Sequence, residues 1–523
     1  MKNRSLFVRG SETQSVPSQS SDAPLIQASS IQEQSLRRGP IGFQLICGLL
    51  LALSTVGLSS CHSASYYYYK FPEFTYAGRP IPPSKLAQRV MIGVSANGSS
   101  GSLQIVDALR DIRSNIQDTI PGFGITGYSS GFPGTILNFP SELRAYVYSN
   151  SDGSLTNINY STEASSGSAG TFESGSSAVA VPPTFAHYYG AEEAAGVLEV
   201  IDNVRGGGFA LNIPNVFKVV VNKGDTVALA MVRNSNVLYR VFKLNQNQYA
   251  TSQLAIQATG SVDCQPTLLP VYCAVAVPGT YDQPSGVYFS LDGTTAYVLN
   301  CGPECGGTTA SVTLLQQGPL NEDAIPSSPV QPNPMIANVP VPGGVTAAIS
   351  DGTTLYLAGQ QLQPDGLFAG FLSTMNQASN EIIGKFSISD GSHSKMLFAD
   401  NSTLWIGSQF CATGERAKLG QNYNCLTMVV LGGATLSPQI VPNVTPGSTT
   451  VVPFPNQNNN QYYYGSLTGI CWVQNYNKVY TAYGGQVHVF RTTDGSEIDN
   501  QFVKVQGTAL DVAYMDALTD DAN

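Results

Sequence analysis

The feature that most constrains this chain is a short motif that recurs along it: an apolar run, a turn with Asp-Gly or Asp-Asn, and a second apolar run. The clearest copies are Gly286–Leu299 (GVYFSLDGTTAYVL), Gly344–Gly359 and Met396–Gly407. Asp-Gly and Asp-Asn tolerate the positive φ that tight two-residue turns require, so each copy predicts a β-hairpin. A hairpin that is repeated along 523 residues predicts a propeller or a similar array.

Eight copies of the motif can be aligned on the residue that opens the second strand of the hairpin. These residues are Met91, Tyr146, His187, Ala228, Tyr297, Tyr356, Trp405 and Tyr480. Most copies are followed by a third alternating strand, as at Val197–Ile201, and several by a fourth, as at Glu381–Ile388. Four short antiparallel strands per repeat predict an all-β propeller of eight blades, or of seven if the degenerate His187 copy is an insertion.

The two ends of the repeat region complement each other. The Met91 copy lacks a first strand, whereas Thr508–Met515 looks like a first strand with no hairpin partner after it. Joining the two would place the C-terminal strand in the first blade and would remove an open sheet edge. We therefore expect a closed propeller over residues 88–516, followed by a short tail at 517–523.

Several segments resemble the YVTN family of β-propeller repeat proteins, whose blades carry SPDG-x-YVTN hairpins and a following V-x-V-I-D strand. The matching segments are Ser290–Asn300 (SLDGTTAYVLN), Ile349–Gly359 (ISDGTTLYLAG), Leu103–Asp107 and Leu198–Asp202. Asn300–Leu315 further resembles an exported-lipoprotein branch of that family. The resemblance spans roughly residues 88–515 and implies a propeller fold. It leaves the activity open, because propellers serve as enzymes, receptors and scaffolds.

Residues 1–60 have the pattern of an export signal. A polar stretch that ends in Arg37-Arg38 precedes Leu45–Leu58, an apolar run of signal-peptide length. The run ends at LSSC, which resembles the bacterial lipobox and implies that Cys61 is lipid-modified; an uncleaved anchor helix is the alternative. Both readings predict an exported protein held in the cell envelope, at the outer membrane or in the periplasm. Residues 61–87 are then a tether without a core of its own.

Six cysteines fall in close pairs: Cys264 with Cys273, Cys301 with Cys305, and Cys411 with Cys425. Such pairs are typical of disulfides in an oxidising compartment. The CGPEC segment at 301–305 could instead bind a metal, but no histidine lies near it, so a disulfide is favoured. No calcium-loop or glycine-rich phosphate motif is present, and we expect neither a metal nor a cofactor.

The charge balance restricts the partners. Charged residues make up 11% of the chain and the net charge is -10, so no basic stripe is available to neutralise phosphates. This argues against nucleic acid as a partner. We expect a monomer that contacts the membrane through its N-terminal lipid and that binds a glycan or a protein.

The longer loops and all three cysteine pairs are expected on one face of the ring, where a rigid scaffold would present a binding surface. Tyrosines supply rigid, half-polar contact area that suits sugars and proteins. The candidate binding residues on this face are Tyr188, Tyr189, Glu192, Glu193, Glu304, Asp365, Tyr423, Tyr462 and Tyr463. The alternative is that the tyrosines only pack at strand ends.

Signals for catalysis are weak. Gly127–Gly131 fits G-x-S-x-G but lacks the strand and helix that this motif needs, and the four histidines are scattered. We therefore expect no catalytic residue and interpret the chain as a lipid-anchored binding scaffold. The alternatives are a lactonase-like hydrolase that uses the propeller channel, as some propellers related to the YVTN group do, and a purely structural envelope protein.

Overall fold

The computed structural model describes residues 76–520, except 77, 97, 99, 114–121, 245–260, 266–269, 325–332, 401, 412–423, 434, 443–456, 459–460, 463, 475 and 499–502. The predicted signal segment and Cys61 therefore lie outside the described residues. Within the described part, no helix has the length and apolar character needed to cross a membrane.

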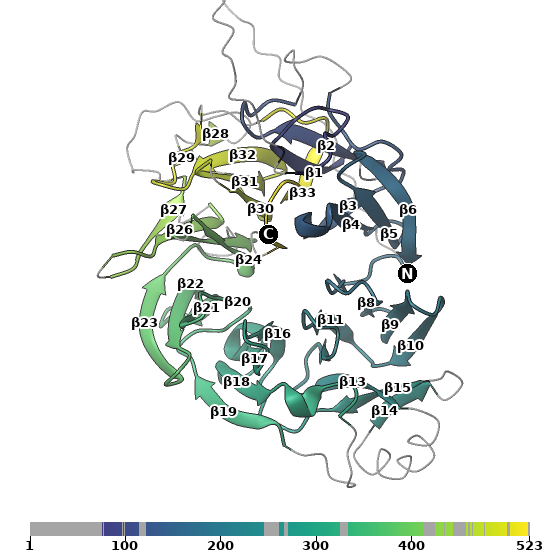
Figure 1. Cartoon of the computed structure of the whole chain (residues 1–523). Coiled ribbons are helices and arrows are strands. Elements are labelled where there is room, and N and C mark those ends of the chain that lie inside the picture. The colour runs from purple at the N-terminus through teal and green to yellow at the C-terminus, as the bar shows by residue number, and fades with distance from the viewer. Residues whose placement is uncertain are drawn as a thin grey trace, which may run out of the picture. The chain divides into compact units, whose positions relative to one another are not determined.

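The strands form eight antiparallel sheets arranged radially around a central opening, which is an eight-bladed β-propeller (Figure 1). We number the blades in ring order and call the strand nearest the centre the first strand. Five blades have four strands, blades 1 and 8 have three, and blade 4 has five. In the described part of blades 1 and 8, isolated bridges occupy the fourth position, among them Gln104 with Gly124 and Val487 with Val503.

The bounds of the elements are as follows. Blade 1 contains β33 (Thr508–Tyr514), β1 (Arg89–Ser95) and β2 (Gly101–Asp107). Blade 2 contains β3 (Pro133–Phe139), β4 (Arg144–Ser149), β5 (Ser154–Asn159) and β6 (Ala164–Thr171). Blade 3 contains β7 (Ala178–Ala180), β8 (His187–Glu192), β9 (Val197–Asp202) and β10 (Gly208–Asn212). Blade 4 contains β11 (Val216–Val221), β12 (Ala228–Val232), β13 (Leu238–Leu244), β15 (Val271–Ala276) and, outermost, β14 (Ser261–Gln265).

Blade 5 contains β16 (Pro284–Phe289), β17 (Thr295–Asn300), β18 (Ser311–Gln316) and β19 (Met335–Pro340). Blade 6 contains β20 (Ala347–Ser350), β21 (Thr354–Leu362), β22 (Phe368–Asn376) and β23 (Glu381–Ser387). Blade 7 contains β24 (Ser392–Ala399), β25 (Thr403–Gln409), β26 (Leu426–Val430) and β27 (Ser437–Val441), and blade 8 contains β30 (Leu467–Val473), β31 (Lys478–Tyr483) and β32 (Gln486–Arg491). A small hairpin, β28 (Gln457–Asn458) with β29 (Gln461–Tyr462), and the 3-10 helices η1 (Pro140–Glu142), η2 (Gly302–Cys305) and η3 (Gly318–Leu320) complete the set.

The repeat predicted from the hairpin motif is confirmed. Each of the eight aligned residues lies in the second strand of a different blade, and His187 opens the second strand of a complete four-stranded blade. The ring therefore has eight blades and not seven. The turns are longer than the two residues expected, because β16 and β17 are joined by Ser290–Thr294 and β20 and β21 by Asp351–Thr353. The Ser290 hydroxyl and the Asp292 carboxylate hold the first of these turns by accepting the backbone N–H of Thr294 at 3.2 and 3.0 Å.

The predicted ring closure is also confirmed. The C-terminal strand β33 pairs antiparallel with β1, from Val90 opposite Tyr514 to Ser95 opposite Thr508 (yellow beside purple in Figure 1). Together with β2 it forms blade 1, so that the last strand of the chain completes the first sheet.

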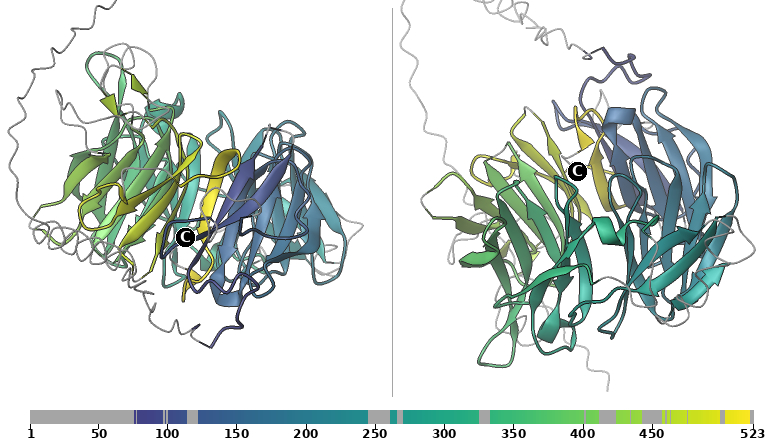
Figure 2. Two further views of the ribbon diagram at one scale, coloured as in Figure 1. Left: turned by 90° about the horizontal axis from the view of Figure 1, so that it is seen from above. Right: turned by 60° about the horizontal axis from the view of Figure 1, so that its bottom comes forward.

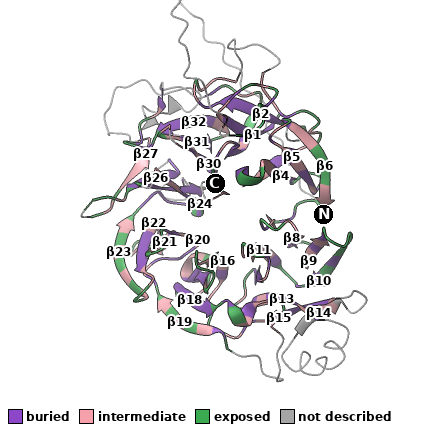
Figure 3. Cartoon of the chain, in the orientation of Figure 1, coloured by how far each residue is buried: buried purple, intermediate pink, exposed green. Residues whose placement is uncertain are grey.

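Burial follows the position of a strand in its blade. All seven residues of β1 are buried, whereas the outermost strand β23 alternates between exposed and half-buried residues (Figure 3). An inner strand is covered on both faces by the neighbouring blades, and this explains its continuous apolar sequence. In the side views the strands of each blade run from one face of the ring to the other (Figure 2).

The order of the strands defines two faces. On the face that we call loop-rich, first strands begin and second strands end; on the opposite, plain face, second strands begin. The Cys301–Cys305 and Cys411–Cys425 disulfides follow second strands and so lie on the loop-rich face, as predicted. The third disulfide does not lie in a loop of that face, because Cys264 and Cys273 face each other across β14 and β15 at the outer edge of blade 4.

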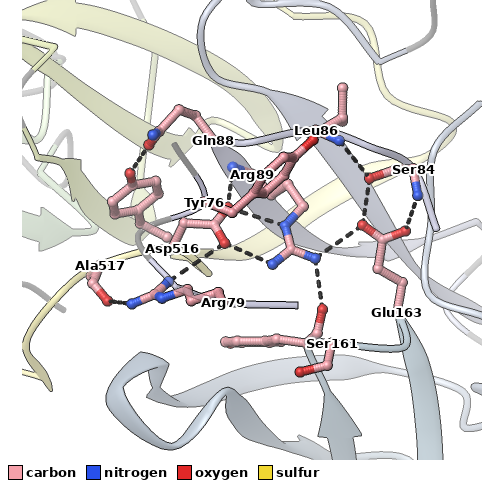
Figure 4. Close-up of polar contacts among 12 residues, drawn as sticks. Tyr76, Arg79, Ser84, Leu86, Gln88, Arg89, Ser161, Glu163, Asp516 and Ala517 are labelled. Carbon is pink, nitrogen blue, oxygen red and sulfur yellow. Dashed lines mark hydrogen bonds and ion pairs between the residues drawn. The ribbon is translucent and has the colours of Figure 1, made fainter. Parts of the chain in front are cut away.

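The ring seam on the plain face is held by buried charges (Figure 4). The Arg89 guanidinium bonds the Asp516 carboxylate at 2.7 Å and the Glu163 carboxylate at 3.0 Å. Burial disfavours the charge on Arg89, but these two carboxylates raise its pKa above the ordinary value. Ser84 donates its backbone N–H to Glu163 at 2.8 Å, and Leu86 is buried. The described end of the expected tether, residues 76–87, therefore packs on the propeller.

Candidate functional site

A cavity of about 430 Å³ opens on the loop-rich face, where the first strands of blades 4, 5 and 7 begin. Four neighbouring blades contribute to its walls. The lining residues are Phe217, Lys218, Val232, Arg233, Asn234, Gln283, Pro284, Ser285, Glu304, Cys305, Thr346, Ser392, His393 and Ser394. Because first strands surround the central opening, the cavity forms one side of the mouth of the channel, and we call it the mouth cavity.

Lys218 lies on the first strand of blade 4 and brings a cation to the mouth cavity. Its ammonium donates to the carbonyl oxygen of Ser285 at 3.0 Å, and burial lowers its pKa. Among the described residues, no carboxylate forms an ion pair with it. Lys395, on the first strand of blade 7, is different, because its ammonium lies 3.4 Å from the Asp511 carboxylate. A partly buried ammonium with spare donors favours a ligand that carries an acceptor or an anion.

His393 also lines this cavity and carries an unpaired acceptor. Its side chain is 1% exposed, and its Nε2 lies 2.8 Å from the carbonyl oxygen of Ser389. A carbonyl can only accept, so Nε2 carries the proton and Nδ1 presents a lone pair. Within the described residues this buried Nδ1 has no hydrogen-bond partner. An unsatisfied buried acceptor costs about 1–3 kcal/mol, and a ligand donor would relieve that cost.

We predict that His393 makes the protein less stable in acid. Burial lowers its pKa to about 4, from about 6.5 in an unfolded chain. Between pH 4 and pH 6.5 the unfolded chain therefore binds a proton at this residue, whereas the folded chain does not. The free energy of unfolding keeps its full value above pH 6.5 and falls by about 2–3 kcal/mol on acidification to pH 4.5. Urea unfolding at pH 7 and pH 4.5 should show this loss in the wild type, and His393→Gln should lack it.

His187→Gln provides the comparison for this prediction. Burial disfavours the charged form of the His187 ring, but Asp225, whose carboxylate lies 2.8 Å from Nδ1, raises its pKa overall. His187 therefore contributes to the free energy of unfolding below its pKa in the unfolded chain, and this contribution is lost as the pH rises through its pKa in the folded chain. The two variants should change the pH profile in opposite directions. Parallel profiles for wild type and His393→Gln would contradict the assignment of a neutral ring.

Glu304 places a carboxylate on another wall of the mouth cavity. It lies in η2, between the bridged Cys301 and Cys305, and accepts the backbone N–H and the side-chain amide of Gln360 at 2.8 and 3.1 Å. Burial raises its pKa, and the hydrogen bonds from Gln360 oppose the rise. Each oxygen keeps a free lone pair, so Glu304 can still accept from a ligand. No ion pair joins it to Lys218 in the described chain.

Arg233 is the remaining charge at the mouth cavity, and it already has partners. Its Nη2 donates to Glu193 Oε2 at 2.9 Å, and its guanidinium carbon lies 4.4 Å from the centre of the Phe217 ring. Its charge is therefore neutralised by Glu193, while Phe217 adds an aromatic wall. The two charges at the cavity without an ion-pair partner in the described residues are thus Lys218 and Glu304.

A second cavity, of about 200 Å³, lies on the plain face beside the ring seam. Its charged residues include Arg79, Arg89 and Asp516 (Figure 4). Arg89 and Asp516 bond each other, and Arg79 donates to the Ala517 carbonyl oxygen and lies 3.6 Å from Asp516. The charges here serve the closure of the ring, and we assign this cavity a structural role.

The structure corrects two of the residues expected on the binding rim. Tyr188 and Tyr189 are each 2% exposed and lie near the start of β8, toward the plain face. Tyr188 packs against Tyr146, and the Tyr189 hydroxyl donates to Asp225 at 3.0 Å. The second strand of a blade is covered on both sides, so these rings present no surface to a ligand.

The other expected binding residues fall into three groups. Glu304 lines the mouth cavity and Glu193 neutralises its arginine. Glu192 is buried, accepts the Glu173 N–H at 2.9 Å, and, with burial, raises the pKa of Glu199 to about 8. Asp365 is exposed in the β21–β22 turn, where it accepts the Leu367 N–H at 3.0 Å. Tyr423, Tyr463 and the side chain of Tyr462 lie outside the described residues.

Sequence reasoning missed Lys218, His393 and Phe217. One signal was present for Lys218, because a lysine interrupts the apolar strand VFKVVV. His393 gave no comparable signal, since its burial depends on the neighbouring blades.

A scan against protein-family models finds no match, and no curated protein matches the sequence. Known structures with a similar fold include the dihydro-heme d1 dehydrogenase NirN in complex with DHE, 12% identical with a TM-score of 0.47 over 85% of this chain and 82% of that one. Hydrazine synthase of Kuenenia stuttgartiensis is 13% identical, with a TM-score of 0.44 over 73% of this chain and 100% of that one. A Bacteroides fragilis protein described as a candidate 6-phosphogluconolactonase is 11% identical, with a TM-score of 0.39 over 82% and 97%. Similarities at this level do not assign an activity to the chain.

Proposed function

We propose that this protein is an exported β-propeller of the YVTN type, anchored in the cell envelope through a lipid on Cys61, that binds a ligand in the mouth cavity. The observation that carries the binding role is a pair of charged groups that line this cavity without an ion-pair partner in the described chain: the Lys218 ammonium and the Glu304 carboxylate. Groups of this kind cost stability when they are left unsatisfied, and binding sites are where such costs occur.

Three disulfides support the extracytoplasmic part of the proposal, because they are typical of oxidising compartments. The lipid anchor is tested by labelling with palmitate and by fractionation. We expect the full chain to incorporate the label and to sediment with membranes, and Cys61→Ala to lose both properties. A Cys61→Ala chain that remains membrane-bound as before would refute the anchor and leave the binding role untouched.

The binding role is tested with a panel of glycans, peptides and small metabolites against the full chain. We expect at least one class to bind, and Lys218→Gln to weaken that binding tenfold or more, since a charge-assisted hydrogen bond is lost. Lys385, exposed on the outer strand β23, gives the matched control. Lys385→Gln should bind as the wild type does. Binding that is indifferent to Lys218 would place the ligand elsewhere.

A hydrolase is the second candidate, favoured by a histidine with an unprotonated Nδ1, His393, that lines the same cavity as the Lys218 ammonium. In this alternative Nδ1 would take a proton from water while Lys218 stabilises the developing oxyanion. Hydrolysis of glucono-lactone above the spontaneous rate, lost in both His393→Gln and Lys218→Gln, would support it. A rate equal to that of buffer would exclude lactonase activity on this substrate.

A further inference from the structure

We infer that the ligand of the mouth cavity is a small zwitterion of the amino-acid type, with its carboxylate on Lys218 and its ammonium directed to Glu304. This inference rests on the proposed binding function and names the class of ligand. The inference follows from the charges in the cavity, because Arg233 has an ion-pair partner whereas Lys218 and Glu304 have none in the described chain.

The charged side chains of the mouth cavity favour a ligand that carries both charges. Three charged side chains line the cavity, and one of them, Arg233, is neutralised by Glu193 through two hydrogen bonds. Lys218 and Glu304 remain, with no ion pair between them among the described residues. A purely anionic ligand would satisfy Lys218 but would add a second negative charge to the cavity that holds the half-buried Glu304. A ligand that carries both charges satisfies both walls.

The unused hydrogen-bond donors and acceptors of the cavity suit the same kind of ligand. Lys218 uses one donor on the Ser285 carbonyl and has donors left for a carboxylate. Glu304 has free lone pairs beyond those used by Gln360. A primary ammonium has three donors and no acceptor, so it suits the Glu304 carboxylate.

The volume and the apolar lining of the mouth cavity indicate the kind of side chain that the ligand carries. About 430 Å³ lies within the range of small-molecule sites and leaves room beyond the two charged groups. Phe217, Val232 and Pro284 give that room apolar walls. The cavity therefore fits an amino acid with an apolar or aromatic side chain.

The positions of the two charged residues are built into the fold. Lys218 is on the innermost strand of blade 4, and Glu304 is in the short turn closed by the Cys301–Cys305 disulfide. A Cβ on Gly344 would lie 2.4 Å from Glu304 Oε2, so a glycine is needed to admit the carboxylate at this place. The carboxylate is thus held in position before any ligand arrives.

A matched series of four compounds tests the inference on the full chain. L-Phenylalanine has both charges, 3-phenylpropionate lacks the ammonium, 2-phenylethylamine lacks the carboxylate, and L-3-phenyllactate has a hydroxyl in place of the ammonium. Calorimetry should show that L-phenylalanine binds and that each of the other three binds at least tenfold more weakly. L-Alanine is included in case the aromatic ring does not fit.

Variants assign the two ends of the ligand. Lys218→Gln should weaken the binding of L-phenylalanine tenfold or more and leave the binding of 2-phenylethylamine unchanged. Glu304→Gln should also weaken the binding of L-phenylalanine tenfold or more, but it should leave the binding of 3-phenylpropionate unchanged. Lys385→Gln is the control. If 3-phenylpropionate or L-3-phenyllactate binds as well as L-phenylalanine, the ligand is a carboxylate and the zwitterion is refuted.

The outcomes separate this inference from the proposed function. If neither amino acid binds but another compound of the broader panel binds in a manner that depends on Lys218, the zwitterion is wrong and the binding role stands. If nothing binds in a manner that depends on Lys218, both are wrong.

Discussion

A chain that ends at Gly507 will not form a stable propeller. The deletion removes β33, the first strand of blade 1, which buries Ala509, Val512, Ala513 and Tyr514. Burial of one large apolar side chain is worth about 1.5–3 kcal/mol, and a domain has only about 5–15 kcal/mol in total. Deletion also exposes the edge of β1, which invites aggregation. We expect loss of the cooperative thermal transition, measured by circular dichroism.

A chain that ends at Asp520 is the control for this deletion, because it keeps β33 and the contacts that follow it. It should melt as the full chain does. A synthetic peptide of residues 508–520, added in trans, should restore part of the transition if pairing with β1 is what was lost. A truncated chain with an unchanged melting temperature would contradict the closed ring.

Arg89→Met will destabilise the folded protein by about 3–5 kcal/mol. The guanidinium holds Asp516 and Glu163, whose side chains are only 8% and 5% exposed (Figure 4). Methionine fills a similar volume but leaves the Glu163 carboxylate buried without its cation and the Asp516 carboxylate with only Arg79, 3.6 Å away. The free energy of unfolding in urea measures the effect. Adding Asp516→Asn and Glu163→Gln to Arg89→Met should recover part of the loss, because the stranded charges are then gone.

Arg233→Met is the matched comparison, since Arg233 also bonds a glutamate but is 50% exposed. Exposed ion pairs are typically worth less than about 1 kcal/mol. The two arginines should therefore differ several-fold in their effect on stability. Equal effects would show that the charges at the seam are not buried as described.

The fold was largely predictable because its signals are local. Turn residues such as Asp292-Gly293 and the alternating strands beside them are read from a few consecutive residues, and these located a second strand in each of the eight blades. The closing strand was predictable because the Met91 repeat lacked a first strand. The fifth strand of blade 4, β14, was not predictable, because the repeat calls for only four strands and these already complete the sheet.

The site was less predictable because burial between blades is not a local property. Tyr188 and Tyr189 look like rim residues in sequence, yet neighbouring blades cover the strand that carries them. His393 is ordinary in sequence and becomes a neutral buried acceptor only when blades 6 and 7 meet. Of the expected set, Glu304 lines the mouth cavity, because the loop that carries it lies on the loop-rich face.

Hydrogen exchange with and without L-phenylalanine tests whether the mouth cavity is the binding site of this protein. We predict slower exchange in peptides that contain Lys218, Glu304 and His393, with no change at the seam around Arg89 and Asp516. Slower exchange confined to the plain face or to the outer strands would contradict the assignment.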